Sequence, residues 1–200
     1  MARSMEDKVD VFSGRIDIVP LDDFNCLDTF CSGVESMDRF IRNDFQLSIE
    51  NHYCTAYTAM YEDEVVAMFA LSFDSLDLDV DDKDELATGM SVTNTPNVDW
   101  NYRDTFYSKS RYPALDIAYL AVQYKWRRKH VGRYLIEMIA KQARTQTFAG
   151  CQFLTVEALA TNEYSAVGFY QRCGFSANET KKPYKDTLRM FRTLYASDDA

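Results

Sequence analysis

Five basic side chains lie at one junction of the chain, where a predicted strand gives way to a predicted helix. Within nine positions of a chain whose net charge is −9, the sequence places Lys125, Arg127, Arg128, Lys129 and Arg133. The first turn of a helix presents unpaired backbone N–H groups and a partial positive charge, so basic side chains added there form an anion site. With Gly132 in that first turn, the segment favours a phosphate site over the alternative of a solvated basic turn.

A second segment places a tyrosine on the inner face of a predicted helix. Ala166 and Tyr170 are four positions apart, which puts them on one helix face. Gly174 and Phe175 follow, where a left-handed glycine cap would end the helix and return the chain to the sheet. Taken alone, Tyr170 is better explained as an ordinary residue of an amphipathic helix.

Length and composition bound the class of protein that carries these segments. The chain has 200 residues, of which 46% are hydrophobic and 14% aromatic, which predicts one folded domain over 1–200 and excludes a disordered chain. The acidic balance, with a pI of about 4.7, argues against a non-specific nucleic-acid binder, although a local basic patch could act against the global sign.

Metal ligands, leader sequences and membrane spans are poorly represented. The five cysteines form no CxxC pair and there are two histidines, so we expect reduced thiols and no metal site. Residues 1–11 are charged, and no apolar run reaches the roughly 20 residues that span a bilayer. The sequence therefore predicts a cytoplasmic protein with no membrane partner.

The elements that must position the two segments begin with a strand over 15–19, whose polar and apolar residues alternate. Ser32 and Glu35 have the S-x-x-E spacing of a capping box, and apolar residues at helical spacing behind them predict a helix over 34–49. A hairpin is predicted by two β-rich runs on either side of an acidic turn, 54–61 and 65–73.

The second half of the chain alternates strand and helix. Its predicted elements are a strand over 114–122, a helix reaching about residue 145, a strand over 152–159, a helix over 163–172 and a strand over 187–195. This alternation predicts an α/β sheet, and the early hairpin makes it a mixed α+β one.

Residues 74–113 form an irregular insertion between the halves. The segment opens with an acidic run and continues with Asn, Thr, Ser and Pro, which predicts a solvated excursion of helix and loop. The alternative is one wall of a substrate site, where its acidic side chains would suit a cationic acceptor. A short acidic tail over 196–200 ends the domain.

The two segments together resemble the GNAT superfamily of acyl-coenzyme-A-dependent N-acetyltransferases. The family's first motif is a strand ending in a Leu-x-Val-like sequence, followed by Arg/Gln-x-x-Gly-x-Gly/Ala at the start of a helix. This chain offers Leu120-Ala-Val122, then Arg127 to Gly132. The second motif, Ala-x-x-Phe-Tyr-x-x-x-Gly-Phe, is matched by Ala166, Phe169, Tyr170, Gly174 and Phe175.

The resemblance, strongest over 114–195, implies the fold and the reaction of the family. The fold would be a central mixed, largely antiparallel sheet of six to seven strands, splayed at the coenzyme site and flanked by helices. The reaction would move an acetyl group from acetyl-CoA, a cosubstrate, directly to a primary amine of a small molecule or protein.

The resemblance also implies roles for individual residues. Backbone groups of the Leu120–Val122 strand would hold the pantetheine arm, amides of 128–133 would cradle the pyrophosphate, and Tyr170 would protonate the leaving thiolate. The implied coenzyme-binding set is Leu120, Ala121, Val122, Arg127, Arg128, Lys129, His130, Val131, Gly132 and Arg133.

Two departures from the family pattern concern the coenzyme site. His130 replaces the first glycine of the phosphate loop, where a Cβ restricts the backbone. The asparagine often found before the second motif is out of register, since Asn162 lies one residue early.

The general base has two candidates. Glu157, near the end of its predicted strand, and Asp116, within the preceding strand, could each face the open cleft and accept the amine proton. Either carboxylate could instead be structural, and deprotonation before binding would leave no dedicated base.

Two rival functions remain open. Residues 30–40 and the long insertion are similar to GNAT toxins that acetylate aminoacyl-tRNA, whereas the low pI counts against a tRNA-facing surface. A non-catalytic acyl-CoA-binding module is the other rival, against which Tyr170 argues. The sequence leaves open the acceptor, the acyl-chain preference, a homodimer and an antitoxin partner.

Overall fold

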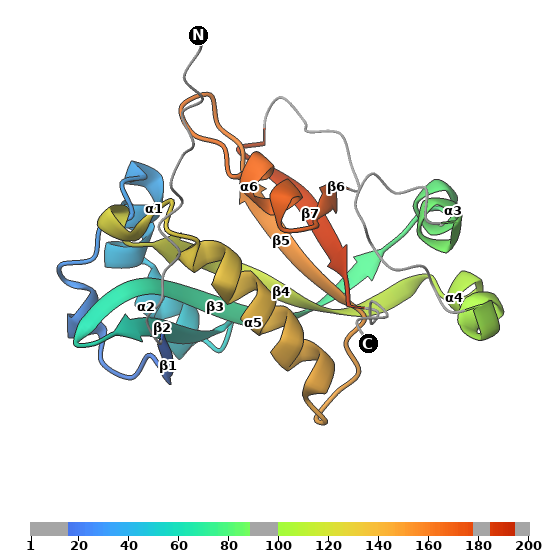
Figure 1. Cartoon of the computed structure of the whole chain (residues 1–200), viewed down its shortest axis with the longest axis horizontal. Coiled ribbons are helices and arrows are strands. Elements are labelled where there is room, and N and C mark those ends of the chain that lie inside the picture. Colours follow the sequence, from blue (N-terminus) through green and yellow to red (C-terminus); the bar gives the residue numbers. More distant parts are fainter. Residues whose placement is uncertain (1–15, 89–99, 178–184, 195–200) are drawn as a thin grey trace, which may run out of the picture.

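The computed structural model describes residues 16–88, 100–177 and 185–194 (Figure 1). The charged start of the chain, the middle of the insertion and the acidic tail at 196–200 therefore lie outside the described residues. No helix in the described part is long and apolar enough to cross a membrane. Within the same residues, no three His, Cys, Asp or Glu side chains are arranged so that they could hold a metal ion.

A single mixed sheet organises the described residues. Its seven strands lie in the order β1-β2-β3-β4-β5-β7-β6. Neighbours are antiparallel except for the parallel pair β4 and β5. The strands are β1 (Asp17–Pro20), β2 (Thr55–Tyr61), β3 (Glu64–Asp77), β4 (Arg111–Val122), β5 (Phe153–Leu159), β6 (Ser176–Ala177) and β7 (Thr187–Thr193). The predicted fold class is confirmed.

The sheet opens at its one parallel pair. Pairing of β4 with β5 covers three residues on each strand and ends at Asp116 with Thr155. Just beyond, the consecutive β3 residues Leu71 and Ala70 pair with Ile117 and Tyr119 of β4. Ala118 is left without a β3 partner and is the extra residue of a β-bulge. From this fork to Val122, β4 pairs with β3 alone, which is the splay that the family resemblance implied.

Helices cover both faces of the sheet (Figure 1). On one face lie α5 (Val131–Thr145) and α6 (Val167–Arg172). The buried α5 residues recur at helical spacing and pack against β3, β4 and β5. On the other face, α1 (Glu35–Asn43) and α2 (Phe45–Glu50) place Ile41 and Phe45 against Met68 and Ala121.

The predicted helix over 34–49 is wrong in two details. It divides at Asp44, whose φ of −122° is not helical, into α1 and α2. Ser32 and Glu35 form no capping box, because the Ser32 hydroxyl donates instead to the buried Asp38 carboxylate at 2.6 Å. That carboxylate also accepts hydrogen bonds from the backbone N–H groups of Ser32 and Gly33. An ionised carboxylate is a stronger hydrogen-bond acceptor than a neutral group.

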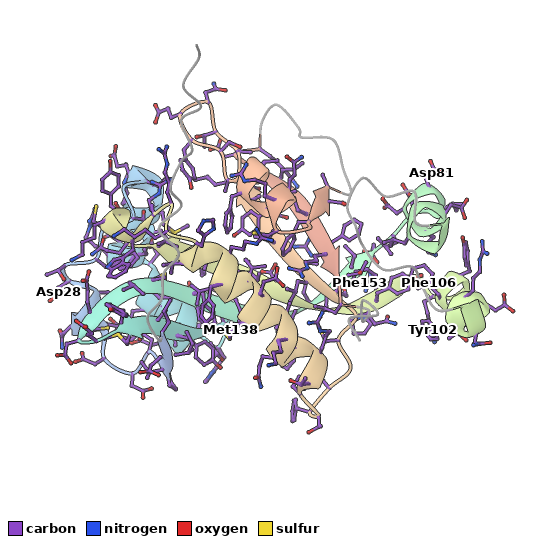
Figure 2. The ribbon with its side chains drawn as sticks, in the orientation of Figure 1. Asp28, Asp81, Tyr102, Phe106, Met138 and Phe153 are labelled. Atoms are coloured by element: carbon purple, nitrogen blue, oxygen red, sulfur yellow. The ribbon has the colours of Figure 1, made fainter. Side chains whose placement is uncertain are left out.

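The insertion contains more regular structure than its composition indicates. β3 continues to Asp77 and β4 begins at Arg111, so both strands extend into it. Between them lie α3 (Val80–Thr88), a 3-10 turn η2 (Trp100–Tyr102) and α4 (Arg103–Ser108). Phe106 and Tyr112 are fully buried with Phe153 in a small separate core, while Asp81 is exposed on α3 (Figure 2). The predicted solvated excursion thus contains strand at both ends and a buried aromatic core.

Candidate active site

A cavity of about 740 Å³ lies in the splay between β4 and β5. Ten of the thirteen candidate catalytic and coenzyme-binding residues line it: Leu120, Val122, Arg127, Arg128, His130, Val131, Gly132, Arg133, Glu157 and Tyr170. Three others do not. Ala121 is buried on the opposite face, Lys129 lies over the Trp126 ring at 4.7 Å, and Asp116 lies at the fork where the strands part.

The free edge of β4 points into this cavity. Gln123 N–H donates to Val66 O at 2.9 Å, which fixes a hydrogen-bonded pair between the two strands. Because such pairs alternate with non-bonded ones along an antiparallel ladder, Leu120 and Val122 direct their N–H and C=O away from β3. These groups face the gap left by β5, where an extended ligand can pair with them.

The loop between β4 and α5 adopts a strained backbone. Arg128 and His130 both have left-handed φ angles, 60° and 62°, and His130 is the N-cap residue of α5. Histidine is among the non-glycine residues found more often in this region, yet the conformation still costs energy. His130 thus adopts a backbone conformation natural to the glycine it replaces, and α5 begins directly behind it with its N–H groups at the cavity.

The basic side chains of this loop have different partners. Arg127 donates to Ser32 O at 3.2 Å and to the Tyr164 hydroxyl at 3.4 Å, and its guanidinium lies 5.3 Å from the Tyr164 ring centroid. Lys125 pairs with Glu64 at 2.8 Å. The exposed Arg128 and Arg133 line the cavity, so they are better placed than Lys125 to meet an anion.

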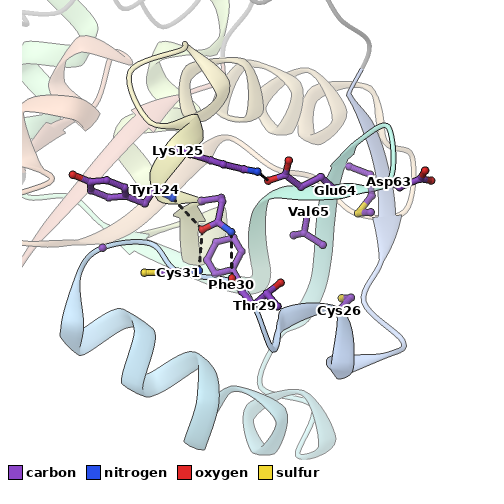
Figure 3. Close-up of a pocket in the computed structure, with 12 residues that line it drawn as sticks. Cys26, Thr29, Phe30, Cys31, Asp63, Glu64, Val65, Tyr124 and Lys125 are labelled. Carbon is purple, nitrogen blue, oxygen red and sulfur yellow. Dashed lines mark hydrogen bonds and ion pairs between the residues drawn. The ribbon is translucent and has the colours of Figure 1, made fainter.

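A side-chain amide fastens the same loop to the chain before α1. Gln123 Oε1 accepts from Cys31 N at 2.9 Å, and Gln123 Nε2 donates to Thr29 O at 3.4 Å. Tyr124 N donates to Cys31 O at 2.7 Å. Thr29, Cys31 and Tyr124 line a separate pocket of about 920 Å³ (Figure 3). No local sequence signal indicated this tie, because its ends are more than 90 positions apart.

Tyr170 is held by apolar packing. It is 5% exposed, and its ring meets Phe169 and Phe175 edge-on at centroid distances of 5.0 and 5.3 Å. Within the described residues its hydroxyl has no hydrogen-bond partner. Burial raises the pKa of the phenol above its usual value, so Tyr170 stays protonated across the physiological range and can act as a donor.

Three carboxylates surround one arginine at the fork. Arg189 on β7 contacts Asp74, and its Nη1 lies 3.8 Å from both Asp116 Oδ1 and Glu157 Oε1. Thr155 donates to Asp116 at 3.1 Å and Thr187 to Glu157 at 2.8 Å. Sequence reasoning found Asp116 and Glu157 but missed Asp74 and Arg189, whose signal would have been charged residues within otherwise apolar strand patterns.

The two candidate bases differ in environment. Burial raises the pKa of Asp116 to about 6, and the charges of Asp74 and Glu157 add to the rise while Arg189 and Thr155 oppose it. The Asp116 side chain is 13% exposed, whereas that of Glu157 is 43% exposed and lines the cavity. The cavity therefore holds a donor, Tyr170, and an acceptor, Glu157, with Asp116 at its fork.

Comparison with known proteins agrees with this geometry. No curated protein matches the sequence. A crystal structure of a bacterial toxin matches the fold with a TM-score of 0.59 at 15% identity, covering 90% of this chain and 92% of that one. AtaT complexed with acetyl-methionyl-tRNAfMet gives 0.60 at 16% identity, covering 88% and 94%. AtaTR bound with AcCoA gives 0.58 at 17% identity, covering 90% and 94%.

A family match covers the two segments that carry the sequence motifs. Residues 80–177, which include the β4–α5 junction and α6, match the family described as acetyltransferase (GNAT) domain. This segment therefore resembles a GNAT domain, the domain of the acyl-CoA-dependent acetyltransferases.

Proposed function

We propose that the protein transfers the acetyl group of acetyl-CoA directly to a primary amine within the cavity between β4 and β5. The observation that carries this proposal is a convergence at one cavity. The free edge of β4, the N-terminus of α5 and the Tyr170 hydroxyl come from separate segments and meet around the same space. Each matches one part of a thioester donor: its amide-bearing arm, its phosphates and its sulfur.

Coenzyme binding divides between backbone and charge. Leu120 and Val122 pair with the amides of the pantetheine arm as a further strand would. Ala121, between them, pairs with Met68 of β3 and so holds the β4 edge in place. The N–H groups of 128–133, in the loop and first turn of α5, face the pyrophosphate. Four arginines line the cavity and Glu157 is the one carboxylate among its described lining residues, so the local field is positive despite the acidic chain.

The chemistry needs no covalent enzyme intermediate. The amine nitrogen attacks the thioester carbonyl carbon, the C–N bond forms, and the C–S bond then breaks. Tyr170 donates its proton to the departing thiolate, and Glu157 or Asp116 takes the proton lost by the amine. A carboxyl whose pKa lies near 6 is suited to that task, because it is ionised at neutral pH yet still basic enough to accept a proton.

For the acceptor we propose the α-amino group of an aminoacyl-tRNA ahead of a small molecule or a protein amine. The solved structures of similar fold include AtaT with acetyl-methionyl-tRNAfMet. The arginines that line the cavity can contact phosphates, although the low pI shows that the chain as a whole is acidic. The pKa of an α-amino group, about 8, is also closer to the pKa of such a carboxyl than is the pKa of a lysine amine, about 10.4.

The acceptor is tested by following free thiol released from acetyl-CoA across an amine panel. The panel contains aminoacyl-tRNA, the matching free amino acid, a polyamine and a lysine peptide. We expect turnover with aminoacyl-tRNA that falls steeply as salt rises, because phosphate contacts release counterions. Equal turnover of the free amino acid and its tRNA ester contradicts the tRNA proposal and leaves a small-molecule acceptor. Absence of turnover with every amine of the panel contradicts the proposed acetyltransferase activity.

We also place this reaction in the cytoplasm. All five cysteines are free thiols, of which Cys26 and Cys31 are exposed. Exposed, unpaired thiols suit a reducing compartment.

A further inference from the structure

The arginine at the fork of the sheet links four strands. Glu157 on β5 and Arg189 on β7 are directly opposite each other in the sheet register. From there the guanidinium reaches Asp116 on β4 and Asp74 on β3. Arg189 is 22% exposed in its side chain, so its charge is only partly screened by water.

This cluster lies where the cavity begins. Asp116 and Thr155 form the last residue pair before β4 and β5 part, so the carboxylate of Asp116 lies at the closed end of the splay. Glu157, two residues further along β5, already lines the cavity together with Tyr170. Arg189 therefore lies behind the proposed bases and does not line the cavity itself.

The charges at the fork do not balance. Asp116 is faced by Asp74 from β3, by Thr155 and Glu157 from β5, and by Arg189 from β7; the phenol groups of Tyr53, Tyr119 and Tyr170 also lie within its electrostatic reach. Against three carboxylates there is one guanidinium. Burial and like charge favour protonation of Asp116, and Arg189 is the cation that opposes both.

We propose that Arg189 is a positioning residue, which holds the carboxylates of Asp116 and Glu157 at the fork in place and ionised, so that they can accept the proton of the attacking amine. This inference rests on the proposed transfer to an amine. Arg189 makes no contact with the reacting atoms, and it acts through the two carboxylates.

The test is the pH profile of kcat/KM, measured by thiol release with an amine that the wild-type enzyme acetylates. In Arg189→Gln the cation is lost, so the acidic limb should move to higher pH by about one unit, the smaller end of the range for a neighbouring charge. In Asp74→Asn a like charge is lost, so the limb should move to lower pH. Merely structural damage lowers the rate in both variants without shifts of opposite sign.

Arg192→Gln is the matched control. Arg192 lies on the same strand but on the opposite face, where it pairs with Glu137 and the carbonyl of Cys173. Its loss should lower stability and leave the acidic limb in place. If Arg189→Gln does not fold, the direction of the shift in Asp74→Asn decides the matter.

The outcomes separate two failures. A wild-type enzyme that releases no thiol with any amine contradicts the proposed function. An active wild type whose acidic limb stays in place in Arg189→Gln, or moves upward in Asp74→Asn, contradicts the role of Arg189 alone.

Discussion

Gly132 lies against the ring of Phe169. A Cβ placed on this glycine would be 3.1 Å from Phe169 Cζ and 3.6 Å from Val122 Cγ2. The absence of a side chain at the start of α5 therefore lets α6 and the free edge of β4 approach together. The glycine of one motif and the phenylalanine of the other are a single packing unit, which gives a physical reason for their joint appearance.

Replacement of Gly132 by Val should abolish the rise in melting temperature that acetyl-CoA produces. The added branches would push Phe169 and the loop apart, and overpacking of this kind costs about 1–3 kcal/mol. The measurement is thermal unfolding with and without acetyl-CoA, which stabilises the native state by binding to it. Gly150→Ala is the control, because nothing lies within 4 Å of a Cβ there. A normal acetyl-CoA shift in Gly132→Val removes the coenzyme loop assignment.

Tyr170→Phe should lower kcat by about 10²–10⁴, the usual contribution of positioned acid catalysis, while acetyl-CoA affinity changes little. The ring contacts with Phe169 and Phe175 remain, and the hydroxyl has no described hydrogen-bond partner to lose. Stability should therefore stay at the wild-type level. The comparison requires chemistry to be rate-limiting, and a variant that keeps more than about half the rate would assign the proton to water or another group.

His130→Gly should stabilise the fold by about 1 kcal/mol, because glycine adopts a φ near 60° without the steric cost that a Cβ brings. Acetyl-CoA should bind the variant at least as well as the wild type. His130→Val, with a branched Cβ in the same conformation, should destabilise by more. Urea unfolding of the three proteins measures the order, and a less stable glycine variant contradicts the strain described at the N-cap.

Asp116→Asn should change how stability depends on pH. The folded pKa of about 6 lies above the usual 3.8, so the fold favours the protonated carboxyl. The stability that this gives is complete below about pH 4 and is lost as pH rises through 6. The amide does not ionise. As pH rises from 4 to 8, the free energy of unfolding of the variant should therefore rise relative to that of the wild type, by up to about 3 kcal/mol.

Glu137→Gln supplies the opposite sign for that experiment. The hydrogen bonds from Arg192 hold the pKa of Glu137 below its usual value, so its contribution is present above the unfolded pKa and lost as pH falls. The free energy of unfolding of this variant should therefore be lower than that of the wild type at neutral pH and equal to it in acid. Denaturant unfolding at several pH values measures both variants, and parallel curves contradict the environment assigned to Asp116.

Local patterns predicted the elements, and they predicted the parts of the site that lie on one segment. The apolar spacing of α5 and the run of β4 predicted the strand-to-helix junction between them, since both signals lie in adjacent residues. Asp38 was missed because its donors come from a preceding turn whose path the spacing does not reveal.

Asp74 and Arg189 were missed for a related reason. Their meeting depends on the register of four strands and on where β4 and β5 separate, and both are set by packing across the whole sheet. A charged residue in a strand pattern can be noticed in a sequence, but its partner 115 positions away cannot.

The tie that Gln123 makes to Thr29 and Cys31 bears on how the protein folds. This tie joins segments more than 90 positions apart and holds the loop that leads into α5, so forming it carries the entropy cost of closing a loop of nearly half the chain. Contacts of such long sequence separation slow folding. Competence to bind acetyl-CoA should therefore appear late in refolding, after α5 has formed, and its kinetics would report assembly of the two halves.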